Sequence, residues 1–175
     1  MQVDPESYRE AIGQFATGVA VVTCAGPDGP AGLTTNAVSS VSLDPLLLLV
    51  CFDERSRTLD AVRAAGRFAV NLLRAGQEDL ARVFASKRVP AEKFEAVTHR
   101  IEHGVPVLDD ALAWLACDVH ALHPAGDHTI AVGAVSHVFS DPGGEPLLFF
   151  RGSWGIVAPA AGRDGSAAGG GTAGR

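Results

Sequence analysis

The sequence predicts a mainly β domain with peripheral helices, arranged as an antiparallel barrel or sandwich. Its apolar stretches are mostly short. Some alternate apolar with polar residues and others are wholly apolar, and both patterns are typical of strands rather than helices. Turn-forming Gly, Pro and Asp residues separate these stretches, which favours hairpin connections over a parallel α/β sheet. A hydrophobic content of 47% over 175 residues is enough for one domain with a substantial core.

Apolar spacing predicts about three helices and six or seven strands. The expected helices span residues 6–16, 56–66 and 77–85. Tyr8, Ala11, Ile12 and Phe15 fall on one face of the first, and Ser56 and Gly66 begin and end the second. The expected strands span residues 19–24, 32–42, 45–52, 67–73 and 146–150, with a long hairpin over 112–139 that turns at 123–128. Residues 86–105 give no clear pattern.

The stretch 32–52 combines a polar strand with an apolar one. β-branched residues favour extended backbone in the first half, and the run 45–52 suits a strand buried on both faces. A row of small hydroxyl groups can line a ligand cleft, because a flat ligand then approaches the backbone closely. An exposed edge strand with the same side chains facing water explains the pattern equally well, so both interpretations remain open.

Composition excludes several classes of protein. The net charge of −6 disfavours nucleic-acid binding. The three cysteines are far apart in apolar runs, which indicates reduced thiols in the cytoplasm rather than disulfides or a zinc site. No signal-peptide or transmembrane pattern is found. We expect one domain over 1–158 and a disordered tail over 159–175, where 11 of 17 residues are Gly or Ala.

Motifs for nucleotide-binding loops, zinc proteases and serine hydrolases are absent, and we expect no metal site. Candidate ligand contacts remain at four places. Ser56 and Thr58 lie at a helix start, where free N–H groups favour an anion. The others are Lys87 and the segments 126–128 and 151–154. Each also has a plain structural explanation: Ser56 as a helix cap, His128 as a surface residue, and Trp154 as an apolar plug.

Taken in order, several segments resemble the short-chain flavin reductase family. They are TGVAVVT (17–23), GLTTNAVSSVSLDP (32–45), SRT (56–58), FAVNLL (68–73), FASK (84–87), KF (93–94), GVPVLDDALAWLAC (104–117), GDH (126–128) and PLLFFRGSW (146–154). Such proteins supply reduced flavin to flavin-dependent monooxygenases and have the FMN-binding split-barrel fold. The resemblance therefore implies an antiparallel split β-barrel, a homodimer, FMN or FAD as the flavin, and NADH or NADPH as the hydride donor.

The resemblance also implies roles for individual residues. Ser56, Thr58 and Lys87 would hold the flavin phosphate, Phe94 would cover the flavin, and His128 would act in catalysis beside the nicotinamide. The polar strand would lie along the flavin ring and ribityl chain through Thr34, Thr35, Asn36, Ala37, Ser39, Ser40, Val41 and Ser42. The remaining nicotinamide contacts would be Gly126, Asp127, Arg151, Gly152, Ser153 and Trp154.

The expected reaction is hydride transfer from nicotinamide to flavin N5, with the reduced flavin passed to a monooxygenase. Because the cofactor carries the redox chemistry, no acid–base side chain is obligatory. Two alternatives keep the same fold: an electron-transfer flavoprotein with permanently bound flavin, and a flavin carrier without efficient turnover.

Overall fold

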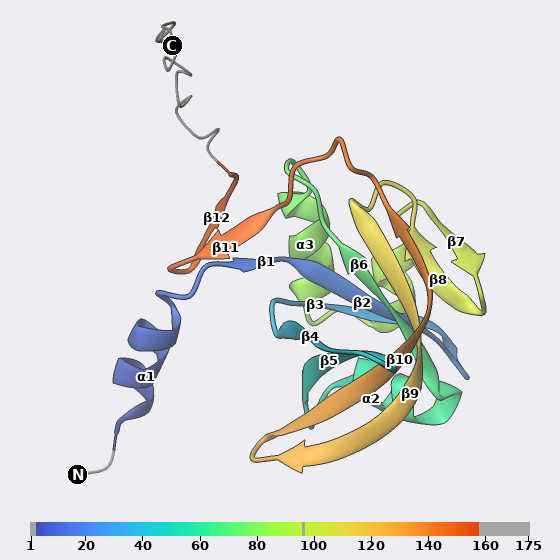
Figure 1. Cartoon of the computed structure of the whole chain (residues 1–175), viewed down its shortest axis with the longest axis horizontal. Helices are drawn as coiled ribbons and strands as arrows, with labels where there is room; N and C mark the ends of the chain where they lie inside the picture. The colour runs from blue at the N-terminus through green and yellow to red at the C-terminus, as the bar shows by residue number, and fades with distance from the viewer. Residues whose placement is uncertain (1–2, 96, 158–175) are drawn as a thin grey trace, which may run out of the picture.

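The computed structural model describes residues 3–95 and 97–157, and it confirms a mainly β architecture (Figure 1). The helices are α1 (Pro5–Ile12), α2 (Arg57–Ala65), α3 (Glu78–Ala85) and α4 (Pro90–Phe94). The strands are β1 (Thr17–Gly18), β2 (Ala20–Gly26), β3 (Gly29–Thr35), β4 (Val38–Leu43), β5 (Leu46–Asp53), β6 (Arg67–Leu72), β7 (His99–Glu102), β8 (Val105–Leu108), β9 (Ala113–Ala125), β10 (His128–Ser140), β11 (Leu148–Phe150) and β12 (Ser153–Gly155). The predicted tail over 159–175 lies outside the described residues.

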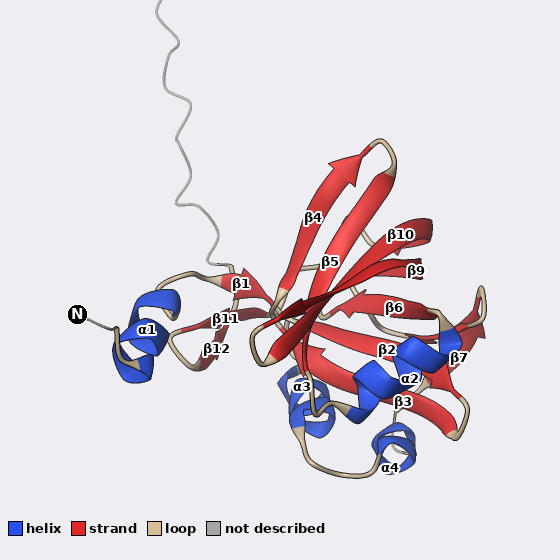
Figure 2. Cartoon of the chain, turned by 90° about the horizontal axis from the view of Figure 1, so that it is seen from below, coloured by secondary structure: helices blue, strands red, loops and turns tan. Residues whose placement is uncertain are grey.

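The main sheet has seven strands in the order β3-β2-β6-β9-β10-β5-β4, and every neighbouring pair is antiparallel. Its two edge strands, β3 and β4, are consecutive in the chain and separated by Asn36 and Ala37 alone. The sheet is therefore curled so that its edges meet at one end, while the β4–β5 hairpin diverges from β3 at the other (Figure 2). Hydrogen bonding among the described strands does not close the sheet.

This break corrects the prediction of one polar strand over 32–42. Thr35 and Val38 belong to strands on opposite sheet edges. Thr35 Oγ1 accepts a hydrogen bond from the Ala37 N–H (3.0 Å), which stabilises the bend between them. β-branched residues predict extended backbone on both sides of the bend, but propensity does not fix which strand each half pairs with.

The long hairpin predicted over 112–139 is confirmed as β9 and β10. Its turn is tighter than expected, because His128 already pairs with Ala125 and leaves only Gly126 and Asp127 between the strands. Gly126 has a φ of 65°, in the left-handed region that suits a tight hairpin turn.

The main core lies between the sheet and α2. Leu59 and Val62 of α2 are fully buried, and each contributes about 1.5–3 kcal/mol by burial. The prediction that β5 is buried on both faces is wrong. Leu48, Val50 and Phe52 are buried, but the residues between them are half-buried, because only the inner face of this part of the sheet packs against the core.

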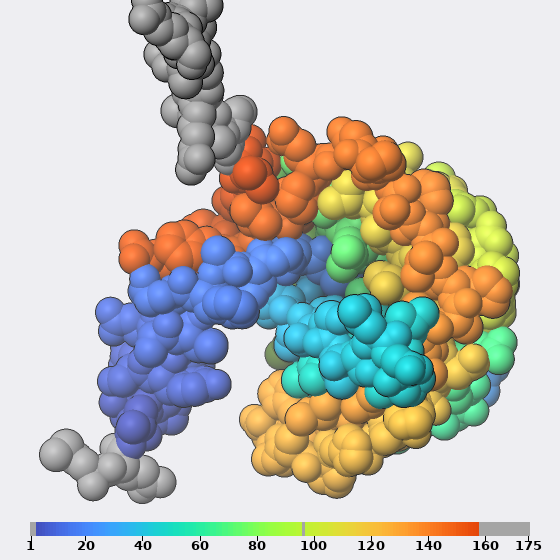
Figure 3. Space-filling view, in the orientation of Figure 1, coloured from blue at the N-terminus to red at the C-terminus, as the bar shows by residue number. Residues whose placement is uncertain are grey.

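The first helix is shorter than predicted and ends at Gly13. Together with β1, β11 and β12 it forms a projection that we call the terminal arm (Figure 1). The apolar face that the sequence predicts for this helix is uncovered in the single chain: Tyr8, Ile12 and Phe15 are 62%, 52% and 70% exposed. A hollow separates α1 from the hairpins of the main sheet (Figure 3).

Residues 86–105 contain α4 and β7, neither of which the sequence pattern predicted. β7 pairs with β8 in a separate two-stranded sheet. Among the described helices, none combines the length and apolar character needed to cross a membrane.

Candidate functional site

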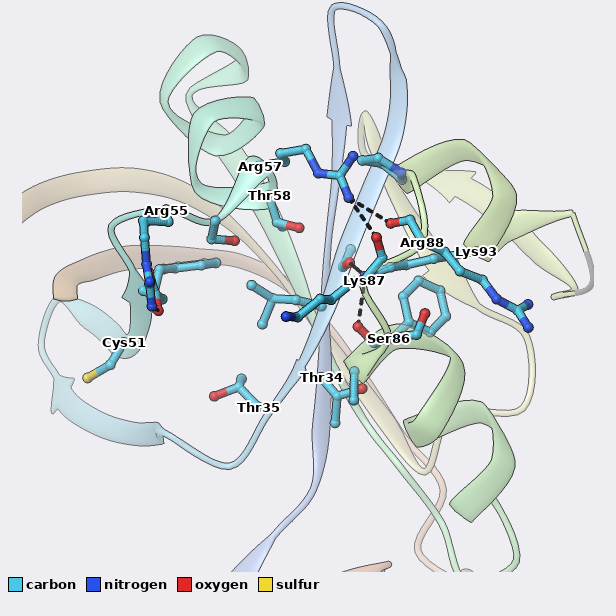
Figure 4. Close-up of a pocket in the computed structure, with 18 of the residues that line it drawn as sticks. Thr34, Thr35, Cys51, Arg55, Arg57, Thr58, Ser86, Lys87, Arg88 and Lys93 are labelled. Carbon is cyan, nitrogen blue, oxygen red and sulfur yellow. Dashed lines mark hydrogen bonds and ion pairs between the residues drawn. The ribbon is translucent and has the colours of Figure 1, made fainter. Parts of the chain in front are cut away.

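A cavity of about 660 Å³ lies between the N-terminus of α2, the chain after α3, and strands β3 and β5 (Figure 4). Its size falls within the range of roughly 300–1,000 Å³ typical of small-molecule sites. The residues that line it are Gly32, Leu33, Thr34, Thr35, Cys51, Phe52, Asp53, Arg55, Ser56, Arg57, Thr58, Phe84, Ala85, Ser86, Lys87, Arg88, Pro90, Lys93 and His128.

The cavity is strongly cationic although the protein is acidic. Five of the 14 Lys and Arg residues line it: Arg55, Arg57, Lys87, Arg88 and Lys93. Asp53 is the acidic residue among the described lining residues, and it is already paired with Arg55 at 2.9 Å. Hydrogen bonds from Arg55 hold the pKa of Asp53 well below its usual range. The remaining cations make this a site for an anionic ligand.

The start of α2 adds hydrogen-bond donors to this charge. Its first backbone N–H groups lack helical partners, and the helix dipole places partial positive charge there. Ser56 is the N-cap, but its side chain makes no capping hydrogen bond to the described residues. Ser56 and Thr58 both line the cavity, so their hydroxyl groups are positioned to contact a bound anion. Their contact with a phosphate stays a prediction, and no side-chain capping bond within the described residues accounts for Ser56.

Arg57 holds the chain after α3 in place. Its Nη2 atom donates hydrogen bonds to the backbone oxygens of Lys87 (3.1 Å) and Arg88 (2.9 Å) (Figure 4). These bonds join the start of α2 to the loop that carries the Lys87 side chain. Lys87 itself is exposed and lines the cavity, and its contact with a phosphate stays a prediction.

Lys93 is a buried cation at the same cavity, with a residue exposure of 7%. Its Nζ atom donates to the backbone oxygens of Gly32 (3.2 Å) and Phe84 (2.9 Å). No ion pair of Lys93 is found within the described part of the chain. Burial, followed by the nearby charge of Arg57, lowers the pKa of Lys93. An anion in the cavity would offset both effects.

The residue that the resemblance implies as a ligand contact is Phe94, the neighbour of Lys93. Phe94 was expected to cover the ligand, but it is 5% exposed and is absent from the cavity lining. Its ring packs edge-on against Phe84, with ring centroids 5.0 Å apart, and against His99 at the same distance. Phe94 therefore supports the wall from behind.

The polar stretch is only partly at the cavity. Thr34 and Thr35 line it, and Thr34 Oγ1 also donates to the Ala81 backbone oxygen (2.6 Å). The other predicted members lie at the bend and along β4, outside the lining of this cavity in the single chain: Asn36, Ala37, Ser39, Ser40, Val41 and Ser42. β4 lies on the opposite sheet edge from β3, which separates the two halves.

The hairpin tip contributes one lining residue. His128 begins β10 and lines the cavity, and its Nδ1 atom is 2.7 Å from Asp127 Oδ1. This hydrogen bond lowers the pKa of Asp127. Gly126 and Asp127 do not line the cavity.

The segment 151–154 lies elsewhere in the single chain. Arg151 and Gly152 border a hollow with α1, where Arg151 Nε donates to Gln14 Oε1 (2.9 Å). Trp154 packs against Phe149 within the terminal arm, with ring centroids 5.2 Å apart. The single chain therefore does not bring these residues to the cavity.

A family model described as a flavin reductase like domain matches residues 12–157. The chain belongs to this family. It is 37% identical over 161 residues to the reductase subunit HsaB of a flavin-dependent monooxygenase from Mycobacterium tuberculosis, covering 90% of this chain and 85% of that protein. It is 41% identical over 156 residues to an NADH-dependent flavin reductase from Rhodococcus, covering 87% and 86%. The structure of the flavin reductase PheA2 superposes with a TM-score of 0.82 at 36% identity, covering 90% of this chain and all of that one.

These comparisons confirm the family named from the sequence. Within this flavin reductase-like chain, sequence reasoning missed the basic residues Arg55, Arg57, Arg88 and Lys93, together with Ser86. Basic residues cluster in the segments 55–57 and 87–93, and that clustering was the available signal. A solvated loop explains such a cluster equally well until the fold places both segments at one cavity.

Proposed function

We propose that the chain is an NADH-dependent flavin reductase that passes reduced flavin to a partner monooxygenase. One observation carries this proposal: in a chain of the flavin reductase-like family, Ser56, Thr58 and several cations converge on one cavity. The names of its relatives support the reaction, the nicotinamide donor and the monooxygenase partner.

The residues present fit a flavin. Hydroxyl groups, free helix N–H groups and cations suit its phosphate, since each donates to or attracts an anion. Thr34 and Thr35 line the cavity from β3, where small side chains let a flat ring approach the backbone. When bound, the flavin supplies the hydride acceptor, so the chain needs no nucleophile of its own.

The role of the protein is to bind and orient the two cofactors. Ser56, Thr58 and Lys87 hold the phosphate, which is remote from the reacting ring. His128 pairs with Asp53 of β5 and lines the same cavity, where its Nε2 atom would hydrogen-bond the nicotinamide. Its other ring nitrogen contacts Asp127, which orients the imidazole.

A homodimer accounts for the predicted residues that lie outside the cavity. In the single chain, the apolar face of α1 is uncovered, and Val41 and Leu43 of β4 are 48% and 84% exposed. Covering these surfaces with a second copy would remove large apolar side chains from water. It would also bring β4 and the segment 151–154 beside a site near the interface. The diverging edges β3 and β4 support the FMN-binding split-barrel assignment.

The cysteines support a cytoplasmic location. Cys24, Cys51 and Cys117 are all free. Burial raises the pKa of the Cys24 thiol to about 11. Burial, with the nearby charge of Asp118, raises the pKa of the Cys117 thiol to about 12. Thiols held in this protonated form are structural, as expected in a reducing compartment.

The test is oxidation of NADH and NADPH by the purified protein, followed by nicotinamide absorbance, with FMN, FAD and riboflavin added in turn. We expect NADH oxidation that depends on added flavin, and a separate flavin-dependent oxygenase should use the product. A protein that purifies with bound flavin and ignores added flavin is a permanent flavoprotein. Flavin binding without NADH oxidation identifies a carrier.

A further inference from the structure

Glu54, the residue that follows β5, holds the chain on both sides of His128. Its backbone N–H donates to the Asp127 oxygen (3.0 Å). Its side-chain atom Oε1 accepts a hydrogen bond from the Thr129 hydroxyl group. His128 itself pairs with Asp53 at the end of β5. One residue therefore fixes the positions immediately before and after the imidazole that lines the cavity.

Arg63 joins this contact to α2. Its Nη2 atom donates to Glu54 Oε2 (3.0 Å) and to Thr129 Oγ1 (3.1 Å). Hydrogen bonds from Thr129, and then from Arg63, hold the pKa of Glu54 below its usual range. The carboxylate is therefore ionised at neutral pH and acts only as an acceptor. Since Thr58 of α2 lines the cavity, this network links the hairpin tip to the helix that forms one wall of the cavity.

The alternation of side chains along β10 connects this network to His128. Thr129 pairs with Phe52, and both are 1% exposed. His128 and its partner Asp53 are adjacent to them in sequence, so their side chains point to the opposite face, where both line the cavity. Holding the Thr129 hydroxyl group in place therefore fixes the rotation of the strand and the direction of the His128 ring.

Packing alone gives the hairpin tip little support. Residues 123–127 are all exposed, and the Asp127 side chain is 91% exposed. Segments with few buried contacts open readily. The bonds to Glu54 are therefore the contacts best placed to keep the tip ordered.

We propose that Glu54 is a positioning residue for His128: it holds the hairpin tip against α2 so that the imidazole stays directed into the cavity. The inference rests on the proposed function, in which His128 hydrogen-bonds the nicotinamide. Glu54 is not among the described residues that line the cavity, so it acts through its neighbours and not on the cofactor. Hydride transfer requires the two rings to be held in a defined geometry, and a small displacement of the group that orients one of them lowers the efficiency of transfer.

The test compares variants that remove the contact with one that keeps it. Glu54→Ala removes the acceptor of the Thr129 hydroxyl group, and Thr129→Val removes the donor with little change in shape. Glu54→Gln loses the charge but keeps an acceptor oxygen. Asp118→Ala is the matched control. Asp118 is also an accessible carboxylate paired with an arginine, Arg67 at 3.1 Å, but it lies opposite Ala134, away from the tip.

The first readout is hydrogen exchange of the ligand-free protein, measured by mass spectrometry, which needs no turnover. We expect faster exchange confined to residues 123–129 in Glu54→Ala and in Thr129→Val. Exchange at the tip should be unchanged in Asp118→Ala and nearly unchanged in Glu54→Gln. Unchanged exchange there in both Glu54→Ala and Thr129→Val overturns the proposal.

The second readout is the KM for NADH at saturating flavin, in a double-mutant cycle with His128→Ala. Glu54→Ala and Thr129→Val should each raise this KM by about fivefold, the equivalent of about 1 kcal/mol, and leave the KM for flavin unchanged. Glu54→Gln should restore most of the loss. In the His128→Ala background, Glu54→Ala should add less than about twofold, because an effect exerted through His128 disappears with that side chain.

A merely structural role for Glu54 gives a different result in this cycle. Its loss would then add in full to that of His128, and full additivity overturns the proposal. If Glu54→Ala does not fold, the same cycle with Thr129→Val decides. An unmodified protein that oxidises no NADH with any flavin overturns the proposed function and this role of Glu54 with it. NADH oxidation with an additive cycle overturns the role of Glu54 alone.

Discussion

The two lysines at the cavity allow a direct comparison of a buried and an exposed cation. Lys93 is 7% exposed and hydrogen-bonded to two backbone oxygens, whereas Lys87 is exposed. We predict that Lys93→Met raises the KM for FMN far more than Lys87→Met does. Methionine retains an unbranched apolar stem and removes the charge in both variants.

The magnitude follows from the dielectric environment. Two unit charges 4 Å apart interact by about 1 kcal/mol in water and about 4 kcal/mol at the effective dielectric constant of a protein. A charge-assisted hydrogen bond contributes about 1.5–3 kcal/mol when sheltered, and a surface pair about 0–1 kcal/mol. Since about 1.4 kcal/mol is tenfold in affinity, Lys93→Met should raise the KM by roughly tenfold to a hundredfold, and Lys87→Met by about fivefold or less.

Steady-state kinetics with FMN and riboflavin test this prediction. Phosphate contacts act equally in the ground and transition states, so kcat at saturating FMN should change little. Riboflavin lacks the phosphate and should be affected by neither substitution. Melting temperatures of both variants show whether the fold is intact. An effect of Lys87→Met equal to or larger than that of Lys93→Met refutes the argument from burial, as does equal damage to FMN and riboflavin in a folded Lys93→Met protein.

The lowered pKa of Lys93 predicts a pH dependence. Above about pH 7 the phosphate is fully ionised, so FMN affinity should fall as pH rises through the lowered pKa and the ammonium loses its proton. The unfolded chain keeps that proton up to about pH 10.4. Between the lowered pKa and about pH 10.4, the unfolded chain therefore binds more protons than the folded protein. The contribution of Lys93 to the free energy of unfolding rises with pH over this range. Lys93→Met should abolish both trends.

Three further predictions concern the nicotinamide, the core and the dimer. His128→Ala should raise the KM for NADH about tenfold, with flavin affinity unchanged; unaltered NADH kinetics would make His128 a surface residue. Asn71→Leu should lower the free energy of unfolding by ~3 kcal/mol in denaturant titrations. The buried Asn71 side chain donates to the Val21 oxygen (3.0 Å) and accepts from the Leu108 N–H (2.9 Å), and the substitution removes both hydrogen bonds. Phe15→Asp should convert a dimer to a monomer in sedimentation experiments, and a native protein that is already monomeric would contradict the dimer proposal.

Local pattern predicted most of the secondary structure. Ser56 and Gly66 begin and end α2 as expected, because helix termini carry strong local signals. The alternation over 112–139 predicted the β9–β10 hairpin, since hairpin pairing is itself local. Burial of β5 was overestimated, because a run of leucines does not reveal how much of the sheet around it is covered.

The site was predictable only where its residues are close in sequence or match the family. One cavity is lined by Ser56, Thr58, Thr34, Thr35, Lys87 and His128, and the contacts with the cofactors that the resemblance implies for them stay predictions. Lys93 was missed because its burial depends on contacts with Gly32, 61 residues away, and with Phe84. The sequence shows a lysine beside a phenylalanine but does not show which of the two faces the cavity.

The distribution of charge suits an enzyme that must both bind and release an anionic flavin. The chain is acidic overall at −6, yet five of its 14 cations surround one cavity. Such focusing raises the local concentration of an anion and its rate of association. Exposed residues such as Lys87 attract the flavin but are screened by salt, whereas the buried Lys93 is screened much less. On the proposed function, we therefore expect the exposed cations to set mainly the rate of capture, and the buried cation to set mainly how long the phosphate is held.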